Sequence, residues 1–479
     1  MRTNAEGAAV EREQSWHDFA GVRVHLIGIG GCGMSGAAMV LLKLGADLSG
    51  SDMIPFDGMG PLVTSGARVS IGHRKEQLDS DVELVVVSAA IPASNPELAE
   101  ARARGVQVMK YAELVAALIR HHRGVAIAGT HGKSTTTAMC VHLCRRAGLQ
   151  PSFLVGATSE QLGGSSGVGL GPHFIVEACE FDRSFLHLRP ESAAILNLES
   201  DHLDCYRDFE EIVEAFTRFA ERVDPDGLLV CSAEDRWAKE AAASAKASVE
   251  TFGFEEDADW RAVNLRSDRD CYAFDVWFQG SRVLSTRLSI PGRYNVSNAL
   301  AAIALAYHAG ADPYSIAKAL PTFSGIQRRL SWCGEGHGVT IIDDYAHHPT
   351  EIRVTIEAAR YRYEPKRTWV VFQPHQHART RYFMDQFAKS FDGADEVIVP
   401  DVYAAREPGN GDDVADSEEL VSRICRGGGR ARYLPTLKAV VEHVSRHVVE
   451  GDLVLTMGAG DVWKVADELV ERIREPIRV

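Results

Sequence analysis

Short apolar runs alternate with longer segments of mixed polarity along most of the chain. Strands that alternate with helix-sized segments in this way indicate parallel sheets covered by helices on both faces. The chain is therefore predicted to be an α/β protein. The runs that predict strands are 22–27, 82–87, 106–109, 124–128, 174–176, 193–196, 339–342, 369–372, 396–399 and 453–456.

The pattern changes character near 120–123 and again near 325, which predicts three domains. The Ala-rich segment 299–309 predicts a helix before the second change, and the glycine-rich stretch 163–171 predicts a surface loop. The predicted divisions are a flexible leader at 1–20, a Rossmann-like domain at 21–123, a central domain at 124–325 and a Rossmann-like C-terminal domain at 326–479.

Composition narrows the class of protein. The 479 residues carry 51 Lys and Arg against 66 Asp and Glu, a formal charge of −15, which argues against a protein that mainly coats nucleic acid or anionic lipid. A local basic pocket for phosphates remains compatible with that charge. The chain has no apolar run of the roughly 18 residues that a membrane helix needs, and its first residues lack the apolar core of a secretory signal. The nine cysteines form no C-x-x-C pair, which favours reduced thiols in a cytoplasmic protein.

A first glycine loop follows the strand predicted at 22–27. Residues Gly28 to Gly33 read G-x-G-x-x-G, and Asp52 follows at the end of the next apolar run. Such a loop turns backbone N–H groups and a helix N-terminus toward a phosphate, while the acid can accept a hydrogen bond from a ribose hydroxyl. Taken alone, the motif is typical of a nicotinamide- or flavin-dependent dehydrogenase, and a tight turn without a ligand is the alternative.

A second glycine loop, Gly129-Thr130-His131-Gly132-Lys133-Ser134, follows the strand predicted at 124–128. It is shorter than the usual P-loop but holds the same chemical groups. The glycines allow close backbone approach, Lys133 suits the β- and γ-phosphates, and Ser134 suits Mg²⁺. The loop predicts a site for a nucleoside triphosphate in the central domain.

The stretch GTHGKSTTTAM around this loop resembles the ATP loop of the Mur ligases, which build the stem peptide of peptidoglycan. The first loop, GIGGCGMSG, is similar to that of the family member that joins L-alanine to UDP-N-acetylmuramate. Further stretches match in the family's order almost to the end of the chain. They are 177–206 (EACEFDRSFLHLRPESAAILNLESDHLDCY), 291–302 (PGRYNVSNALAA), 326–330 (IQRRL), 343–351 (DDYAHHPTE), 372–380 (FQPHQHART), 401–408 (DVYAAREP) and 457–463 (MGAGDVW).

The resemblance implies a cytoplasmic ligase of peptidoglycan precursor synthesis that uses ATP and Mg²⁺. Its substrates would be UDP-N-acetylmuramate and L-alanine, joined through an acyl phosphate on the sugar's carboxylate. The first domain would hold the UDP-sugar and the central domain ATP, while the third would bring amino-acid groups and close over ATP. A monomer or weak homodimer is expected, with neither nucleic acid nor membrane as a partner.

The resemblance also assigns roles to individual residues. The catalytic residues would be Lys133, Glu177, His202, Asp344 and His347. The ATP-binding residues would be Gly129, Thr130, His131, Gly132, Lys133, Ser134, Thr135, Asn298, Arg329 and Asp344. The UDP-sugar would contact Gly30, Gly31, Gly33, Asp52 and Ser88. The amino acid would contact His348, His375 and Arg379, and the metal would contact Ser134, Glu177 and His202.

Several residues near these positions keep more than one interpretation. Either Arg328 or Arg329 would reach ATP. Glu180 and Asp182 either support the metal ligands or form a solvated face, and Asn295 is interpreted as a helix cap.

The chain departs from the family's usual residues at three places. Gln376 stands where the family commonly has Arg, Cys179 where it has Asp, and Ser134 where it has Thr. The change at Gln376 removes a charge near the expected amino-acid site, and Arg381 is the residue that would compensate for it.

Three other functions compete with this interpretation. A recycling ligase would add a preformed tripeptide to the same sugar nucleotide. A nicotinamide-dependent dehydrogenase would explain the first glycine loop but leave the second without a role. A catalytically silent nucleotide-binding regulator would have no need to keep Lys133, Glu177, His202 and Asp344.

Overall fold

The computed structural model describes residues 19–202, 205–268, 271–405 and 414–474, so most of the predicted leader lies outside the described residues. The chain forms two compact units. The first unit comprises Met1–Val263, Asp275–Thr286 and Ser297–Phe323, and the second comprises Asn264–Phe274, Arg287–Val296 and Ser324–Val479. Within the described residues, no helix is both long enough and apolar enough to cross a membrane.

The first unit begins with a five-stranded parallel sheet in the order β3-β2-β1-β4-β5. Successive strands are added on one side of β1 up to β3 and then, from β4, on its other side. Ligands of open α/β sheets bind at such a reversal of the strand order. The strands are β1 (Arg23–Ile27), β2 (Asp47–Asp52), β3 (Arg68–Ile71), β4 (Leu84–Val87) and β5 (Gln107–Lys110). The helices are α2 (Cys32–Lys43), α3 (Met59–Thr64), α4 (Pro96–Ala103) and α5 (Tyr111–Ile119).

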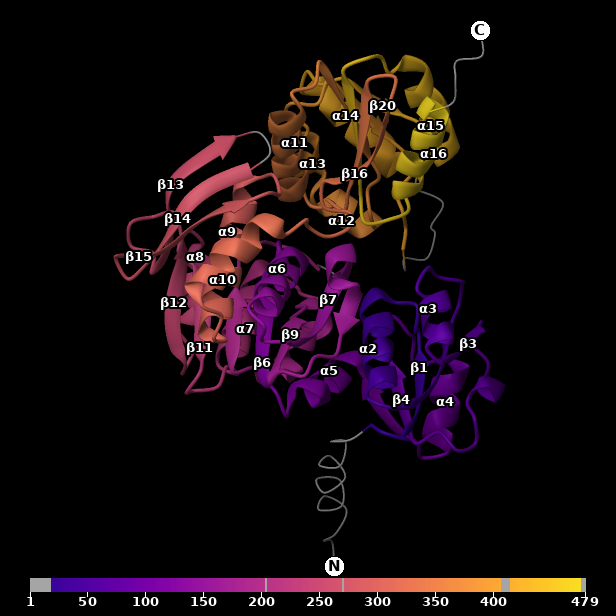
Figure 1. Cartoon of the computed structure of the whole chain (residues 1–479). Helices are drawn as coiled ribbons and strands as arrows, with labels where there is room; N and C mark the ends of the chain where they lie inside the picture. The colour runs from indigo at the N-terminus through magenta and orange to yellow at the C-terminus, as the bar shows by residue number, and fades with distance from the viewer. Residues whose placement is uncertain (1–18, 203–204, 269–270, 406–413, 475–479) are drawn as a thin grey trace, which may run out of the picture. The chain divides into compact units, whose positions relative to one another are not determined.

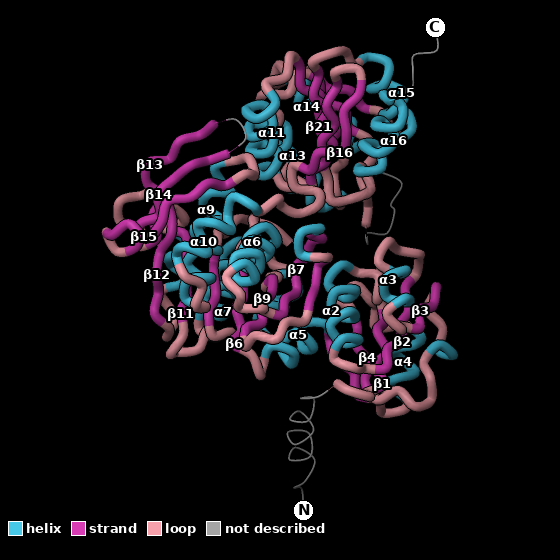
Figure 2. The backbone as a smooth tube through the Cα atoms, viewed as in Figure 1, coloured by secondary structure: helices cyan, strands magenta, loops and turns pink. Residues whose placement is uncertain are grey.

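The central sheet has the order β15-β14-β13-β12-β11-β10-β6-β9-β7-β8. Figure 2 shows its strands with α6 and α7 among the helices packed beside them. The strands are β6 (Arg123–Ala128), β7 (Ser152–Ser159), β8 (Gly164–Gly167), β9 (His173–Glu177), β10 (Ser192–Ile195), β11 (Leu228–Ser232), β12 (Ser248–Gly253), β13 (Trp260–Asp268), β14 (Cys271–Phe278) and β15 (Ser281–Leu288). The helices are α6 (Lys133–Arg146), α7 (Phe209–Ala220), α8 (Arg236–Ala242), α9 (Arg293–His308) and α10 (Pro313–Ala319), with 3₁₀ turns η2 (Glu160–Leu162), η3 (Phe181–His187) and η4 (Leu320–Thr322).

Several strands of the central sheet were not predicted from the sequence, among them β7, β11 and β12. Part of the loop predicted at 163–171 is the strand β8, which pairs antiparallel with β7. The strands β13, β14 and β15, visible at one end of the sheet in Figure 1, were not predicted. Strand β8 contains no apolar run, and it is recognised only by its hydrogen bonds to β7.

The second unit contains a six-stranded sheet in the order β16-β17-β21-β18-β19-β20, parallel except for β16. Its core includes Ile341, Val371, Val454 and Leu469, all almost fully buried. The strands are β16 (Ser331–Gly336), β17 (Val339–Asp344), β18 (Arg367–Phe372), β19 (Glu396–Val399), β20 (Ala431–Tyr433) and β21 (Asp452–Met457). The helices are α11 (Pro349–Tyr363), α12 (His377–Tyr382), α13 (Met384–Ala388), α14 (Val414–Arg426), α15 (Leu437–His447) and α16 (Trp463–Arg474).

Candidate functional site

The first glycine loop connects β1 to α2 and lies at the reversal point of its sheet. Asp52, the last residue of β2, accepts a hydrogen bond from the backbone N–H of Gly30 at 2.8 Å. Ser88 follows β4, and a Cβ atom built on Gly28 would lie 3.1 Å from its Cβ. The structure therefore brings the predicted residues Gly30, Asp52 and Ser88 to one edge of the sheet, with the acid holding the loop itself. Gly31 is the N-cap of α2.

Tyr111, the first residue of α5, packs against this loop, and the sequence analysis did not single it out. A Cβ atom on Gly33 would lie only 2.7 Å from the phenolic oxygen of Tyr111, so the contact requires glycine. Burial and the carboxylate of Glu177 raise the pKa of Tyr111, which keeps the hydroxyl protonated. Tyr111 belongs to no motif of the sequence, so the loop contact has no signal there.

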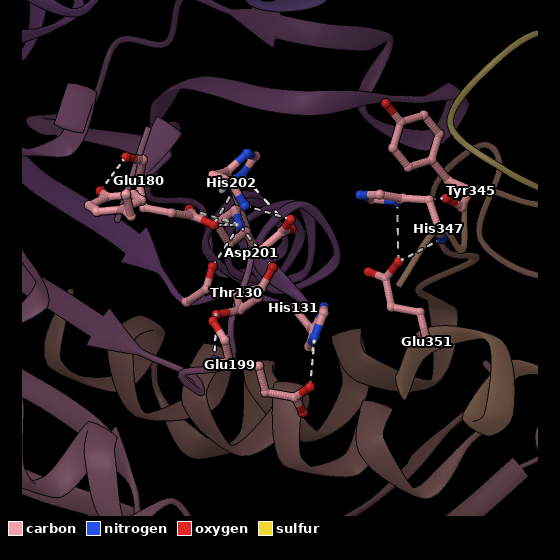
Figure 3. A network of polar contacts seen from close by, with 12 residues as sticks. Thr130, His131, Glu180, Glu199, Asp201, His202, Tyr345, His347 and Glu351 are labelled. Atoms are coloured by element: carbon pink, nitrogen blue, oxygen red, sulfur yellow. Dashed lines mark hydrogen bonds and ion pairs between the residues drawn. The ribbon is translucent and has the colours of Figure 1, made fainter. Parts of the chain in front are cut away.

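The second glycine loop connects β6 to α6 and is held by the segment that follows β10. The hydroxyl of Thr130 donates to the carbonyl of Glu199 at 3.3 Å and accepts from its N–H at 2.9 Å. The N–H of His131 donates to Oδ1 of Asn197 at 2.8 Å, and the amide nitrogen of Asn197 donates back to the carbonyl of His131 at 3.1 Å. Figure 3 shows Thr130 and His131 beside Glu199. These reciprocal bonds fix the loop before any ligand binds.

Gly132 ends this loop and caps α6 in the left-handed region, with φ of +80°. A Cβ atom at this position would lie 2.5 Å from Oδ1 of Asn298 on α9. The structure thus places the predicted ATP residue Asn298 directly against the loop. The next residues, Lys133, Ser134 and Thr135, form the first turn of α6, whose N-terminus favours anions.

Lys133, Glu180 and His202 form a buried charged cluster at the carboxyl ends of the central strands (Figure 3 labels the acid and the imidazole). The ammonium of Lys133 lies 3.0 Å from the carboxylate of Glu180 and donates to the carbonyls of Gly129 and Thr130. Nε2 of His202 lies 3.5 Å from the same carboxylate. Glu180 is 3% exposed, so its interpretation as part of a solvated face is wrong, and it is central to the cluster.

The charges in this cluster support one another. Burial alone would favour neutral forms, but the carboxylates of Glu180 and Glu177 outweigh it and raise the pKa of Lys133. Lys133 and His202 in turn lower the pKa of Glu180 against the effect of its burial. Burial lowers the pKa of His202, but Glu180 and Asp201 outweigh this and raise it. Lys133 is therefore held as a full positive charge within the phosphate loop.

Asp182 differs from its neighbour Glu180. Its carboxylate pairs with the ammonium of Lys110 at 2.8 Å, and both side chains are about half exposed (40% and 55%). This pair links η3 to the segment before α5. Of the two acids whose role the sequence left open, Asp182 belongs to the solvated face.

Two of the three predicted metal ligands, Ser134 and Glu177, carry oxygen donors that suit Mg²⁺. Glu177 ends β9, where one carboxylate oxygen accepts a hydrogen bond from the N–H of Gly156 at 2.8 Å. Carboxylate and hydroxyl oxygens are the ligands that Mg²⁺ prefers. Cys179 lies within 4.8 Å of Glu180 and His202, but burial raises the pKa of its thiol to about 12, so it remains a neutral thiol. The carboxylate of Glu177 and the hydroxyl of Ser134 therefore suit the ion, whereas the imidazole of His202 faces the carboxylate of Glu180 at 3.5 Å.

A second polar cluster lies in the second unit, where β17 ends at Asp344. The two carboxylate oxygens of Asp344 accept hydrogen bonds from the N–H groups of Leu330 and Ala346, each at 2.7 Å. Burial raises the pKa of Asp344 to about 6, opposed by the nearby guanidinium of Arg329 and these two bonds. The predicted residues Arg329 and Asp344 are therefore brought together.

The structure also distinguishes the two arginines. Arg328 pairs with Asp343 at 2.9 Å and donates to the carbonyls of Gly458 and Gly460. Its guanidinium therefore stabilises the fold of the second unit. Arg329 pairs with Glu351 at 3.4 Å. Of the two, Arg329 is the better candidate for a ligand contact.

Glu351, on α11, also organises His347. Its carboxylate accepts the backbone N–H of His347 at 3.0 Å and lies 3.3 Å from the ring nitrogen Nδ1, which is 3.0 Å from the carbonyl of Tyr345. Figure 3 shows this group of three residues. Glu351 was not identified from the sequence, although it lies in the matched stretch 343–351.

The predicted amino-acid residues occupy neighbouring parts of the second unit. His348 caps α11 by accepting from the N–H of Thr350, and its ring packs edge-on against Phe383. The rings of His347 and His375 lie 6.4 Å apart between centroids. Arg379 is buried on α12.

Gln376 has a left-handed backbone with φ of +66° at the start of α12, and strain of this kind concentrates at functional sites. Arg381 pairs with Asp416 at 3.0 Å, and Asp416 also binds His377 at 2.8 Å. The expectation that Arg381 compensates for Gln376 stays untested, and its charge is already balanced by Asp416.

Comparison with known proteins identifies the family. Three family models match in order: the Mur ligase family catalytic domain at residues 23–123, the Mur ligase middle domain at 127–306 and the Mur ligase glutamate ligase domain at 328–460. The chain is 41% identical over 449 residues to the UDP-N-acetylmuramate–L-alanine ligase of Alkaliphilus metalliredigens, covering 93% of this chain and 96% of that protein. It is 41% identical over 455 residues to the protein of the same name from Pelotomaculum thermopropionicum, covering 94% and 98%.

Solved structures give the same picture. The UDP-N-acetylmuramate-alanine ligase of Thermotoga maritima superposes with a TM-score of 0.80 at 29% identity, covering 94% of this chain and 98% of that one. A murein peptide ligase from Psychrobacter arcticus shares the fold, with a TM-score of 0.73 at 24% identity over 96% of this chain and all of that one.

Three parallel-rich sheets and a charged phosphate loop at the end of the central one define an α/β enzyme built to use a nucleoside triphosphate. The family models cover most of the chain, and the relatives match over nearly its full length. The chain belongs to the Mur ligase family.

Proposed function

We propose that this protein joins L-alanine to the carboxylate of UDP-N-acetylmuramate at the expense of ATP, as a step of peptidoglycan precursor synthesis. The observation that carries the proposal is the similarity, at about 40% identity over nearly the whole chain, to relatives that bear the name of this activity. A cytoplasmic location and action as a monomer or weak homodimer complete the proposal.

The reaction divides into two displacements. The sugar's carboxylate attacks the γ-phosphorus of ATP, ADP leaves, and an acyl phosphate forms. The amine of L-alanine then attacks the acyl carbon, and phosphate leaves as the amide forms. Both steps bring negative groups together, so fixed cations beside the γ-phosphate lower the barrier.

Lys133 supplies such a cation in the proposed mechanism. It is already charged and buried, and Glu180 together with two loop carbonyls fixes its position. Ser134, Glu177 and His202 are the proposed ligands of Mg²⁺, which when bound would neutralise phosphate charge. Thr130, His131 and Asn298 belong to the same ATP site in this proposal, as do Arg329 and Asp344 of the second unit.

We propose that the first glycine loop holds the diphosphate of the sugar nucleotide. The N–H of Gly30, oriented by Asp52, is one of its donors, and Gly31, Gly33 and Ser88 complete the contact surface. In the second unit, His347, His348, His375 and Arg379 are the proposed contacts of the amino acid. This assigns 21–123 to the UDP-sugar, 124–325 to ATP and 326–479 to the amino acid.

Phosphate release from ATP tests the proposal. The enzyme is assayed with Mg²⁺ and UDP-N-acetylmuramate against single amino acids and the stem tripeptide, with Lys133→Met as the inactive control. Stimulation mainly by L-alanine supports the proposal. Stimulation by the tripeptide would instead indicate a recycling ligase, and stimulation by glycine or serine would assign a changed specificity to the region of Gln376. No release under any condition would indicate a silent regulator.

A further inference from the structure

A basic pocket lies on the first unit, at the edge of the central sheet where the parallel strands begin. The pocket has a volume of about 630 Å³. Its walls come from the segment before β10, the end of α7, the turn before β11 and the segment before β12; Figure 1 labels α7, β11 and β12. It is lined by Arg189, Arg218, Glu221, Arg222, Val223, Asp224, Pro225 and Lys246.

The pocket is separate from both glycine loops. The loop at 129–132 follows the carboxyl end of β6, and Arg189 precedes the amino end of its parallel neighbour β10. At roughly 3.3 Å per residue, the four residues of β10 put about 13 Å of strand between the two edges. A ligand in the pocket would therefore not touch the ATP loop.

The cations of the pocket have no partner that would explain them. Among the residues that the structure describes, Arg189, Arg218, Arg222 and Lys246 form no ion pair. The acid beside Arg189, Glu191, is bound by Arg123 instead.

The acids that line the pocket do not neutralise it. The carboxylate of Asp224 accepts the backbone N–H of Asp226 at 2.9 Å, within its own turn. Both carboxylates keep their negative charge, so Glu221 and Asp224 offset two of the four cations and the lining keeps a net positive charge. On a chain whose formal charge is −15, such a concentration of positive charge is local and specific.

The arginines also repel one another. Burial, together with the charges of Arg189 and Arg218, lowers the pKa of Arg222. The end of α7 carries the negative pole of the helix and so favours Arg218 and Arg222, but Arg189 comes from a different segment and adds to the repulsion. Cations held together in excess over the neighbouring acids are stabilised when an anion binds between them.

We propose that this pocket is a binding site for a small phosphorylated anion carrying more than one phosphate group, separate from the substrate sites. Arginine binds phosphate oxygens through paired N–H groups, which suits the three guanidinium groups here. The volume lies within the range of roughly 300–1,000 Å³ of small-molecule pockets. Its concave form favours a small molecule over a membrane surface, which would require a flat face.

Titration calorimetry with inorganic tripolyphosphate tests the site. The full chain is titrated in Mg²⁺-free buffer at low salt, as wild type and as Arg189→Gln/Arg222→Gln. Binding at the glycine loops is common to both proteins. We expect wild type to show an additional binding event whose Kd rises at least tenfold in the double variant.

A matched control and a milder variant keep the result unambiguous. Arg102 and Arg282 are exposed and form no ion pair with described residues, so Arg102→Gln/Arg282→Gln removes the same charge elsewhere. The single variant Arg189→Gln changes an exposed side chain and covers the case in which the double variant unfolds. Equal isotherms for wild type and the pocket variants would overturn the proposal, and so would an equal loss in the control pair.

Discussion

Replacing Glu180 with glutamine should destabilise the first unit strongly although the side chain keeps its size. The carboxylate is 3% exposed and lies 3.0 Å from the ammonium of Lys133, whose side chain is 12% exposed. Glutamine can still accept a hydrogen bond from that ammonium, but it carries no negative charge to compensate the buried cation. Removing one member of a buried pair typically costs about 3–5 kcal/mol because the other charge stays uncompensated.

Asp182 provides the matched control for this change. Asp182 lies two residues after Glu180 and pairs with Lys110 at 2.8 Å, but its side chain is 40% exposed. Exposed pairs contribute about 0–1 kcal/mol, so Asp182→Asn should fall in that range. The comparison separates the effect of burial from the loss of a negative charge.

The assay is chemical unfolding of the three proteins at pH 7, checked by calorimetry for separate transitions of the two units. The difference for Glu180→Gln should shrink at low pH. Lys133 and His202 lower the pKa of Glu180 below its ordinary 4.5 in the folded protein, so its contribution is complete above pH 4.5 and is lost as acid protonates it.

A double-mutant cycle gives the sharper test. Lys133→Met alone leaves Glu180 buried with His202 as its remaining charged partner, whereas the double variant removes both members of the pair. The double variant should therefore be more stable than the sum of the single losses predicts. Additive losses, or losses under 1 kcal/mol for Glu180→Gln, would refute the account of the cluster.

Three further predictions address other parts of the chain. Burial raises the pKa of Asp344 from 3.8 to about 6, so ionising this carboxyl group in the folded protein costs about 3 kcal/mol. The free energy of unfolding of wild type, relative to that of Asp344→Asn, should therefore fall by about this amount as pH rises from about 4 to 7, which unfolding at each pH would measure. Asp52→Ala removes the acceptor of the Gly30 N–H and should raise the KM for the sugar nucleotide roughly tenfold without changing the KM for ATP, whereas equal changes would contradict the assignment of the loops. Gly132→Ala places a Cβ atom 2.5 Å from Asn298 on a left-handed backbone, so it should lower the free energy of unfolding by at least about 1 kcal/mol and weaken nucleotide binding. Unchanged nucleotide binding in calorimetry would be inconsistent with the loop geometry.

The sequence predicted most of the buried parallel strands because each is an apolar run between helix-sized segments. Strands β6, β9 and β10 were expected at these places, and their carboxyl ends correctly located the central cluster. The long strands β13 and β15 mix polar and apolar residues, so the same criterion missed them, and the more apolar β14 between them was missed as well. Strand β8 is glycine- and serine-rich and depends on pairing with β7.

Residues of the candidate site could be predicted from the sequence where the residue type and its motif together allow only one chemical role. A lysine in a glycine loop, such as Lys133, has little reason to exist without an anion. Glu180 kept two interpretations and Glu351 was not singled out, because an acid after a strand or in the first turn of a helix serves equally well on a solvated face. Their importance arises from burial against Lys133 and His347, which only the folded chain brings about. The choice between Arg328 and Arg329 likewise required the contacts of each guanidinium.

Gly156 on β7 connects the first glycine loop to the end of β9 through hydrogen bonds of its two backbone groups. Its carbonyl accepts the thiol of Cys32, in the first turn of α2, at 3.0 Å, and its N–H donates to Glu177 at 2.8 Å. A ligand that shifts either partner therefore acts on a residue that the other partner also holds. Under the proposed assignment of the two sites, this coupling is reciprocal: the factor by which the sugar nucleotide changes the affinity for the metal is the factor by which the metal changes the affinity for the sugar nucleotide.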